Sequence, residues 1–278
     1  MKENIKAIDV SVSPFFKEKI ELWKKSSSYV YGAQLLTKGA NIFKGTEDLI
    51  EEMDQNGVEK AIVSGSQSDY LFTSNDWIAE QVRKYPDRLH GCASVNPKKG
   101  MQSVREFERA VKELGLIGLK FHPYADGYPP NHNIYYPFYS KCVELNVPVA
   151  IQVGHTGPMF SSEPGRPIYL DEVALFFPEL TIIGSHMGWP WIEEMIALAW
   201  KHPNVYIDTT AHVPKHFPKE FVHFMKTFGQ DKVLYGTSWP FFSMVRSLSE
   251  LEALKLKDDI KRKFLRDNAI RAWKLGHR

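Results

Sequence analysis

The chain has 278 residues, of which 43% are hydrophobic and 24% are charged, and its formal net charge is +2. This composition is typical of a folded globular protein and excludes a disordered or collagen-like chain, while the near-neutral charge argues against a nucleic-acid partner. The sequence has no run of 18 apolar residues and no apolar secretion signal, so we expect a cytoplasmic protein with no membrane partner.

Eight short apolar segments alternate with longer segments of helical pattern along the chain. The predicted strands are 6–12, 60–64, 89–95, 117–121, 148–153, 181–185, 205–208 and 232–235. The predicted helices are 46–56, 75–85, 102–114, 136–145, 169–176, 191–200, 219–228 and 244–254, with a last helix near 258–275. This alternation predicts an α/β fold, a single (β/α)8 TIM barrel over residues 1–278. An open doubly wound sheet is the alternative, but the sequence lacks a glycine-rich dinucleotide turn after the first strand.

One long insertion, residues 14–45, follows the first predicted strand. Its aromatic residues are Phe15, Phe16, Trp23, Tyr29, Tyr31 and Phe43. Long loops in compact domains are usually functional or disordered, and this many aromatic residues argue against disorder. We expect a lid or wall over the barrel mouth. An ordinary packing excursion or a subunit contact is the other interpretation, and the latter would make the chain a homodimer.

Polar residues follow most of the predicted strands. In a barrel these strand ends converge on one pocket, so chemistry is expected there. The main candidates are Ser11, Ser13, Lys120, His122, Gln152, His155, His186, Asp208 and Ser238. Four separate junctions carry a histidine, since His212 follows Asp208. One histidine alone would usually be structural, but four at converging positions favour a site.

The same junctions resemble those of the amidohydrolase superfamily, specifically its amidohydrolase-2 branch of hydrolases and decarboxylases. The resemblance runs through the segments Asp-Val-Ser-Val-Ser-Pro (9–14), Gly-Leu-Lys-Phe-His-Pro (118–123), Pro-Val-Ala-Ile-Gln (148–152), Gly-Ser-His-Met-Gly (184–188), Asn-Val-Tyr-Ile-Asp (204–208) and Val-Leu-Tyr-Gly-Thr-Ser-Trp-Pro (233–240). These motifs span essentially the whole chain in the family's order. The resemblance implies a metal-binding TIM-barrel enzyme.

The resemblance also implies where a metal, commonly zinc, would bind: two histidines on the first strand, one on the fifth and an aspartate on the eighth. This sequence has Ser11, Ser13, Gln152 and Ser238 at those positions, and keeps the sixth-strand histidine as His186. A zinc site needs three or four Cys, His, Asp or Glu ligands. We therefore expect the inherited metal site to be lost and no cofactor to be needed. A rearranged zinc site formed by His122, His155 and His186 is the alternative.

We therefore expect a hydrolase acting on a small, carboxylated organic molecule such as a lactone or amide. His186, with His122 and His155, would transfer and position protons, and Asp208 would orient a histidine or charge a substrate amine. The predicted substrate-binding residues are Ser11, Ser13, Lys120, Gln152, Arg166, Trp189, Ser238 and Trp239. Lys120 could instead point to solvent. Two alternatives remain open: a binding protein without activity, and a metal-dependent hydrolase or decarboxylase with rearranged ligands.

Overall fold

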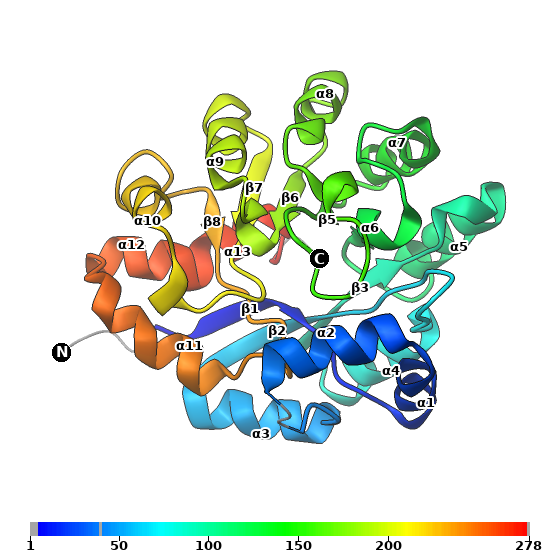
Figure 1. Ribbon diagram of the computed structural model, residues 1–278, viewed down its shortest axis with the longest axis horizontal. Coiled ribbons are helices and arrows are strands. Elements are labelled where there is room, and N and C mark those ends of the chain that lie inside the picture. Colours follow the sequence, from blue (N-terminus) through cyan, green and yellow to red (C-terminus); the bar gives the residue numbers. More distant parts are fainter. Residues whose placement is uncertain (1–4, 39–40, 277–278) are drawn as a thin grey trace.

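The computed structural model describes residues 5–38 and 41–276, and its centre is a sheet of eight parallel strands. The strands follow one another around the sheet in chain order (Figure 1). They are β1 (Ala7–Val12), β2 (Val58–Ser64), β3 (Leu89–Ser94), β4 (Leu119–Phe121), β5 (Val149–Gln152), β6 (Ile182–Ser185), β7 (Val205–Asp208) and β8 (Val233–Leu234).

The last strand meets the first, which closes the sheet. The Val10 N–H donates to the carbonyl of Tyr235 at 3.0 Å, and the Ser238 N–H donates to the carbonyl of Ser11 at 2.9 Å. Val12 also forms a parallel bridge with Trp239. These contacts, together with helices between the strands, confirm the predicted (β/α)8 barrel.

Helices surround the barrel and connect its strands (Figure 1). The connecting helices are α3 (Thr46–Asn56), α4 (Asn75–Lys84), α5 (Met101–Lys112), the short α6 (Pro123–Asp126), α7 (Tyr136–Glu144), α8 (Tyr169–Phe176), α9 (Ile192–Lys201) and α10 (Lys219–Lys226). After β8 come α11 (Met244–Leu251), α12 (Asp258–Arg262), a π-helical turn (Lys263–Asp267) and α13 (Asn268–Ala272). The last predicted helix is therefore three short pieces. Among residues 5–38 and 41–276, no helix is both long and apolar enough to cross a bilayer.

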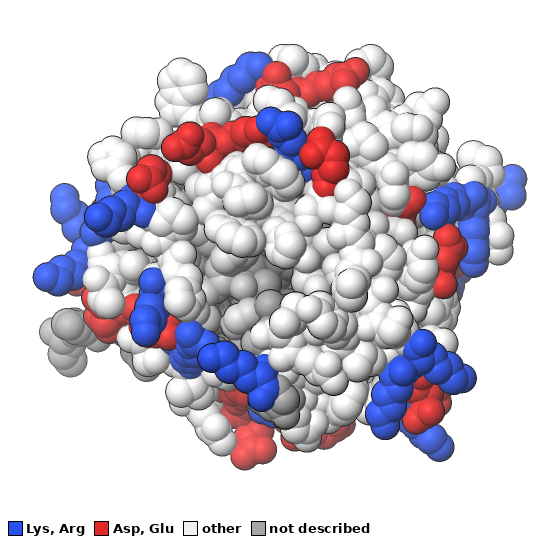
Figure 2. All heavy atoms as spheres, viewed as in Figure 1, with Lys and Arg blue, Asp and Glu red and all other residues white. Residues whose placement is uncertain are grey.

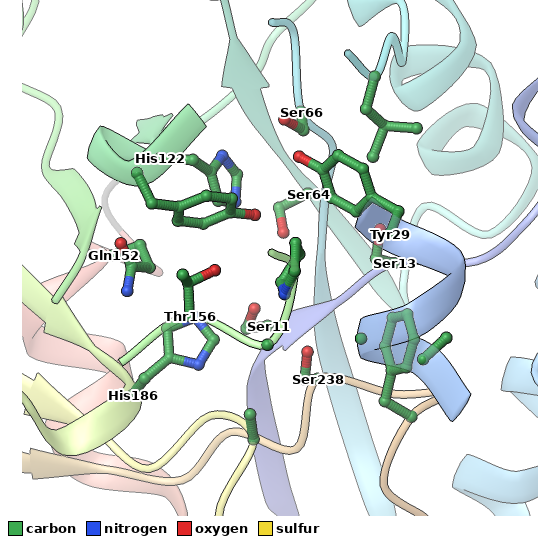
Figure 3. Close-up of a pocket in the computed structure, with 18 of the residues that line it drawn as sticks. Ser11, Ser13, Tyr29, Ser64, Ser66, His122, Gln152, Thr156, His186 and Ser238 are labelled. Carbon is green, nitrogen blue, oxygen red and sulfur yellow. The ribbon is translucent and has the colours of Figure 1, made fainter. Parts of the chain in front are cut away.

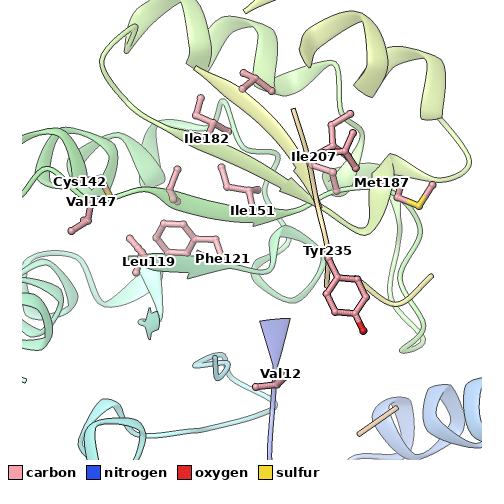
Figure 4. Close-up of a cluster of buried hydrophobic side chains, with 14 of the residues drawn as sticks. Val12, Leu119, Phe121, Cys142, Val147, Ile151, Ile182, Met187, Ile207 and Tyr235 are labelled. Atoms are coloured by element: carbon pink, nitrogen blue, oxygen red, sulfur yellow. The ribbon is translucent and has the colours of Figure 1, made fainter. Parts of the chain in front are cut away.

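The core has two layers. The larger layer packs the outward faces of the strands against the helices, as with Phe121, Ile151 and Ile207 (Figure 4). The smaller layer fills the lower barrel interior and includes the side chain of Trp273. A Cβ atom on Gly118 would lie 2.7 Å from the Trp273 ring, so this glycine lets the indole pack against the strand. The lower interior is thus filled, and the site must lie at the other end of the barrel.

The insertion after β1 folds into two helices, α1 (Lys17–Lys25) and α2 (Ser27–Thr37), which lie on the barrel face seen in Figure 1. Its side chains Phe15, Trp23 and Tyr29 are buried in a small apolar cluster of their own. The helix α2 packs against the loop after β5, because a Cβ atom on Gly32 would lie 2.6 Å from the Gly157 carbonyl oxygen. The homodimer stays a prediction.

Candidate functional site

A cavity of about 330 Å³ opens at the carboxyl ends of the strands, beneath the insertion. It is lined from β1, β2, β4 and β5, from the loops after the strands, and from α1 and α2. The molecular face in Figure 2 is hollowed near its centre, and most charged side chains on that face lie towards its edge. The close-up shows His122, Gln152 and His186 on one side of the pocket, Ser13 and Tyr29 on the other, and Ser11, Ser64 and Ser238 between them (Figure 3).

Strand alternation builds the polar floor of this cavity. Ile62 and Ala150 belong to the apolar interior, and Ser64 and Gln152, two residues further along the same strands, line the cavity above them. On β1 the pattern differs, because Val10 is interior and Ser11 also lines the cavity. The pairing register of β1 with β2 shifts between Asp9 and Val12. Such irregularities re-aim side chains near functional sites.

Lys120 on β4 points into the barrel and is only 6% exposed. Its ammonium donates to the Ser11 hydroxyl at 2.8 Å and to the Ser64 hydroxyl at 3.2 Å. The alternative that Lys120 points to solvent is therefore wrong. Burial lowers the pKa of Lys120 from its ordinary 10.5, although the charge of Asp208 acts in the opposite direction.

Two histidines, His122 and His186, face the same cavity. Burial lowers the pKa of His122 well below 6.5, and the positive charge of Lys120 lowers it further. Burial likewise lowers the pKa of His186, against an opposing effect of Asp208. Both imidazoles are therefore neutral near pH 7 in the free protein, able to offer one N–H donor and one acceptor nitrogen.

Asp208 does not line the cavity, and its carboxylate is used to shape the turn after β6. One oxygen accepts from the Ser185 hydroxyl at 2.7 Å, and the other accepts from the backbone N–H groups of His186 (3.1 Å) and Thr210 (3.0 Å). His186 has a φ of 72°, a conformation that non-glycine residues adopt rarely. Asp208 thus positions His186 through its backbone and does not face a ligand.

The other predicted residues divide into two groups. Ser13, Gln152, His155, Trp189 and Ser238 line the cavity, with His155 and Trp189 exposed at its rim and their rings 5.5 Å apart.

Arg166 and Trp239 are not in the part of the chain that lines the cavity. Arg166 lies at the end of the loop that follows β5 and pairs with Glu194 at 2.8 Å on the surface. The Trp239 indole is fully buried and donates to Glu52 at 2.8 Å, which turns it away from the mouth. Both expectations are corrected: these side chains serve the fold.

Lys19 on α1 is a cavity residue that the sequence reasoning missed. It is 2% exposed, and its ammonium donates to the Ser13 hydroxyl at 2.7 Å. The signal was present, since Phe15, Lys19 and Trp23 are spaced by four residues and so share one face of a helix. A lysine in that apolar stripe is unusual enough to indicate a site.

The charge of the cavity lining is one-sided. Among the described residues that form it there are two lysines, Lys19 and Lys120, and no aspartate or glutamate. Apolar and aromatic side chains such as Phe15, Trp23 and Phe241 form much of the wall. An uncharged ring with an anionic substituent fits such a lining.

Four strand-end residues occupy the positions where the family resemblance implies metal ligands. Ser11, Ser13, Gln152 and Ser238 all line the cavity. Within residues 5–38 and 41–276, no three or more His, Cys, Asp or Glu side chains are grouped so that they could hold a metal ion. The expected alternative of a zinc site formed by His122, His155 and His186 is therefore not supported by their arrangement.

Three comparisons place the chain among known proteins. A family model described as Amidohydrolase matches residues 50–275. A gamma-resorcylate decarboxylase from Polaromonas sp. (strain JS666) is 26% identical over 279 residues, covering 84% of each chain. An uncharacterized TIM-barrel protein from Bordetella bronchiseptica superposes with a TM-score of 0.82 at 25% identity, covering 98% of this chain and 99% of the other. The 5-carboxyvanillate decarboxylase from Novosphingobium aromaticivorans superposes with a TM-score of 0.76 at 19% identity, covering 97% and 96%.

The expectation that no cofactor is needed is contradicted by one of these neighbours. The structure of the Novosphingobium enzyme contains bound manganese, together with 4-hydroxy-3-methoxy-5-nitrobenzoic acid. The loss of ligand residues at four strand ends is therefore not sufficient evidence that a protein of this family needs no cofactor.

Proposed function

The chain belongs to the amidohydrolase family, and from that premise we propose that it is an enzyme that removes a carboxyl group from a small carboxylated aromatic molecule. The observation that carries the proposal is the cavity lining, with two buried lysines, no acidic side chain among its described residues, and aromatic walls. The gamma-resorcylate decarboxylase relative supports decarboxylation as the reaction. We expected hydrolysis from the resemblance, and decarboxylation replaces it for this reason.

Lys120 binds the carboxylate or another anionic group of this substrate. Two of its N–H donors go to Ser11 and Ser64, and among the described residues the third has no hydrogen-bond partner. The two serine oxygens accept from the ammonium, so their hydroxyl protons are free to donate to a ligand. The floor therefore offers donors to a negative charge, which is the arrangement that stabilises an oxyanion.

His122 and His186 supply the proton that decarboxylation consumes. When the bond to the carboxyl group breaks and carbon dioxide leaves, the ring carbon keeps the electron pair and takes up one proton. Both imidazoles are neutral in the free protein because burial lowers each pKa. An anion entering the cavity raises those pKa values, which favours the protonated imidazole that can donate to the ring carbon.

The Novosphingobium neighbour binds manganese, which raises the question of whether the side chains of this cavity could bind such an ion. Manganese prefers oxygen ligands from carboxylates, carbonyls and water. The floor presents serine hydroxyls and the Gln152 amide, and the ammonium of Lys120 lies among them. These residues do not fit a divalent ion, because hydroxyls are weak ligands and the lysine repels positive charge.

A substrate panel tests the proposal. Hydroxybenzoates and benzene dicarboxylates are incubated with the protein, with and without added manganese, and carbon dioxide release is measured with the loss of substrate absorbance. We expect at least one compound to be decarboxylated, and we expect His186→Asn to reduce that turnover by roughly 100-fold or more, the usual contribution of a proton-transfer group. Tight binding without turnover of any compound would identify a binding protein instead. Unchanged turnover in His186→Asn would remove its assigned role.

A further inference from the structure

The insertion brings a second lysine to the cavity, independently of the barrel. Lys19 comes from α1, and its ammonium donates to the Ser13 hydroxyl (2.7 Å) and to the carbonyls of Ser13 (3.2 Å) and Pro14 (3.0 Å). Lys17 on the same helix is exposed. Of these two lysines on α1, only Lys19 therefore faces the cavity.

The contact between Lys19 and Ser13 resembles that between Lys120 and Ser11, except that protein acceptors take all three Lys19 N–H donors, so the Ser13 hydroxyl is the donor left for a ligand. In both places a serine oxygen accepts from a buried ammonium, which leaves the hydroxyl proton to donate elsewhere. Ser11 and Ser13 come from one strand, and each is paired with a different lysine. The cavity thus contains two separate lysine–serine pairs.

Two buried ammonium groups in one cavity oppose each other. Burial, with a smaller contribution from the charge of Lys120, lowers the pKa of Lys19 from 10.5 to about 7. The described residues that line the cavity contain no carboxylate, and the charges of Asp208 and Asp9, which lie outside the lining, act on Lys120 and not on Lys19. An apolar side chain at position 19 would pack in the same place without this desolvation cost. The pair is arranged for negative charge that arrives with a ligand.

We propose that the substrate carries two anionic groups, and that Lys19 with Ser13 binds the second while Lys120 with Ser11 and Ser64 binds the first. The inference rests on the proposed function, in that it assumes a carboxylated aromatic ligand in this cavity. It names the substrate class as aromatic dicarboxylates and makes Lys19 a specificity-determining residue. The competing explanation is structural: the three hydrogen bonds of Lys19 would serve only to hold α1 against the end of β1.

The preference for two charges separates these explanations. Dissociation constants are measured by titration calorimetry for benzoate and for benzene-1,3-dicarboxylate, on the intact protein. Lys19→Met is compared with wild type and with Lys17→Met, which removes the same charge from the exposed side of the same helix. We expect wild type to prefer the dicarboxylate by roughly 10- to 100-fold, the usual effect of a charge-assisted hydrogen bond. Lys19→Met should reduce the ratio to about one, and Lys17→Met should leave it unchanged.

A structural role would instead weaken both ligands equally, so an unchanged ratio in Lys19→Met overturns the inference. Ser13→Ala provides a second variant should Lys19→Met fold poorly, because it keeps the backbone acceptors of Lys19 and removes the hydroxyl. It should lower the same ratio, and an unchanged ratio again overturns the inference. Benzoate binding with no dicarboxylate preference in wild type refutes the second anion subsite alone. Failure of wild type to bind either compound counts against the proposed function as well.

Discussion

Replacing Gly32 with alanine should loosen the contact between the insertion and the barrel. The added Cβ would lie 2.6 Å from the Gly157 carbonyl oxygen and 2.8 Å from the Pro158 nitrogen, both of them backbone atoms. Ordinary contacts of a Cβ begin at 3.4 Å, so α2 or the 154–166 loop must move by most of an ångström. Because that loop carries His155 and Thr156, the cavity should open.

The expected size of the effect follows from two opposing contributions. Overpacking of this kind costs about 1–3 kcal/mol, and alanine stabilises a helix by about 1 kcal/mol relative to glycine. The packing of the insertion helices α1 and α2 on the barrel, here called the closed lid, should therefore lose up to about 2 kcal/mol, or up to about 30-fold in the ratio of packed to detached helices. The barrel does not share this contact, so its unfolding temperature should change little.

Hydrogen exchange of segments 27–37 and 154–166, together with the affinity for a bound carboxylate, measures this loosening. Gln34→Ala is the control, since it introduces alanine on the exposed side of the same helix with only a small gain in helix propensity. We expect faster exchange and weaker binding in Gly32→Ala alone. Exchange in Gly32→Ala as slow as in Gln34→Ala would refute the argument that this contact holds the lid.

Three further changes test the site and the barrel. Lys120→Met should weaken carboxylate binding by roughly 10- to 150-fold without lowering the unfolding temperature, because it removes a buried ammonium. Calorimetry measures both the dissociation constant and the unfolding temperature, and a large loss of stability would contradict the prediction. Glu52→Gln should lower the free energy of unfolding by about 2–4 kcal/mol. The Glu52 carboxylate accepts from the Trp239 indole and the Met244 N–H, each at 2.8 Å, whereas an amide has only one acceptor oxygen. The control Glu51→Gln changes an exposed side chain and should leave the free energy of unfolding unchanged. Burial raises the pKa of Asp9 from 3.8 to about 7, so its stabilising effect is complete below the unfolded value and is lost as pH rises towards 7. In Asp9→Asn, denaturant unfolding should therefore show a smaller fall in stability between about pH 4 and pH 7, and an identical pH profile would refute the shift.

The sequence predicted the barrel well because its signals were local. The helices α3 and α8 begin and end at the predicted residues, and all eight strands were found. Strands buried on both faces are continuous apolar runs, and helices have a different period, so the alternation is visible without tertiary information. The insertion was harder, because the pattern of its two helices was obscured by the number of aromatic residues.

The site was predicted in part, and the misses have a physical reason. Strand ends converge in a barrel, so Ser11, His122 and Gln152 could be placed at the cavity from order alone. The direction in which each side chain points, and its hydrogen-bond partners, could not be predicted from the order of the strands. Trp239 is turned away by its hydrogen bond to Glu52, and Asp208 is engaged by the turn after β6. Each of these depends on residues distant in sequence.

The two lysine–serine pairs also bear on how a reaction cycle would end. A buried ammonium that has lost its anionic partner is left desolvated, a state that favours entry of a new anionic substrate. Loss of carbon dioxide converts an anionic group of the ligand into a neutral C–H, so the product would be held less strongly than the substrate by the same lysine and serine donors. Charge removal in the cavity would then drive turnover by promoting product release, with no need for the lid to distinguish the two molecules.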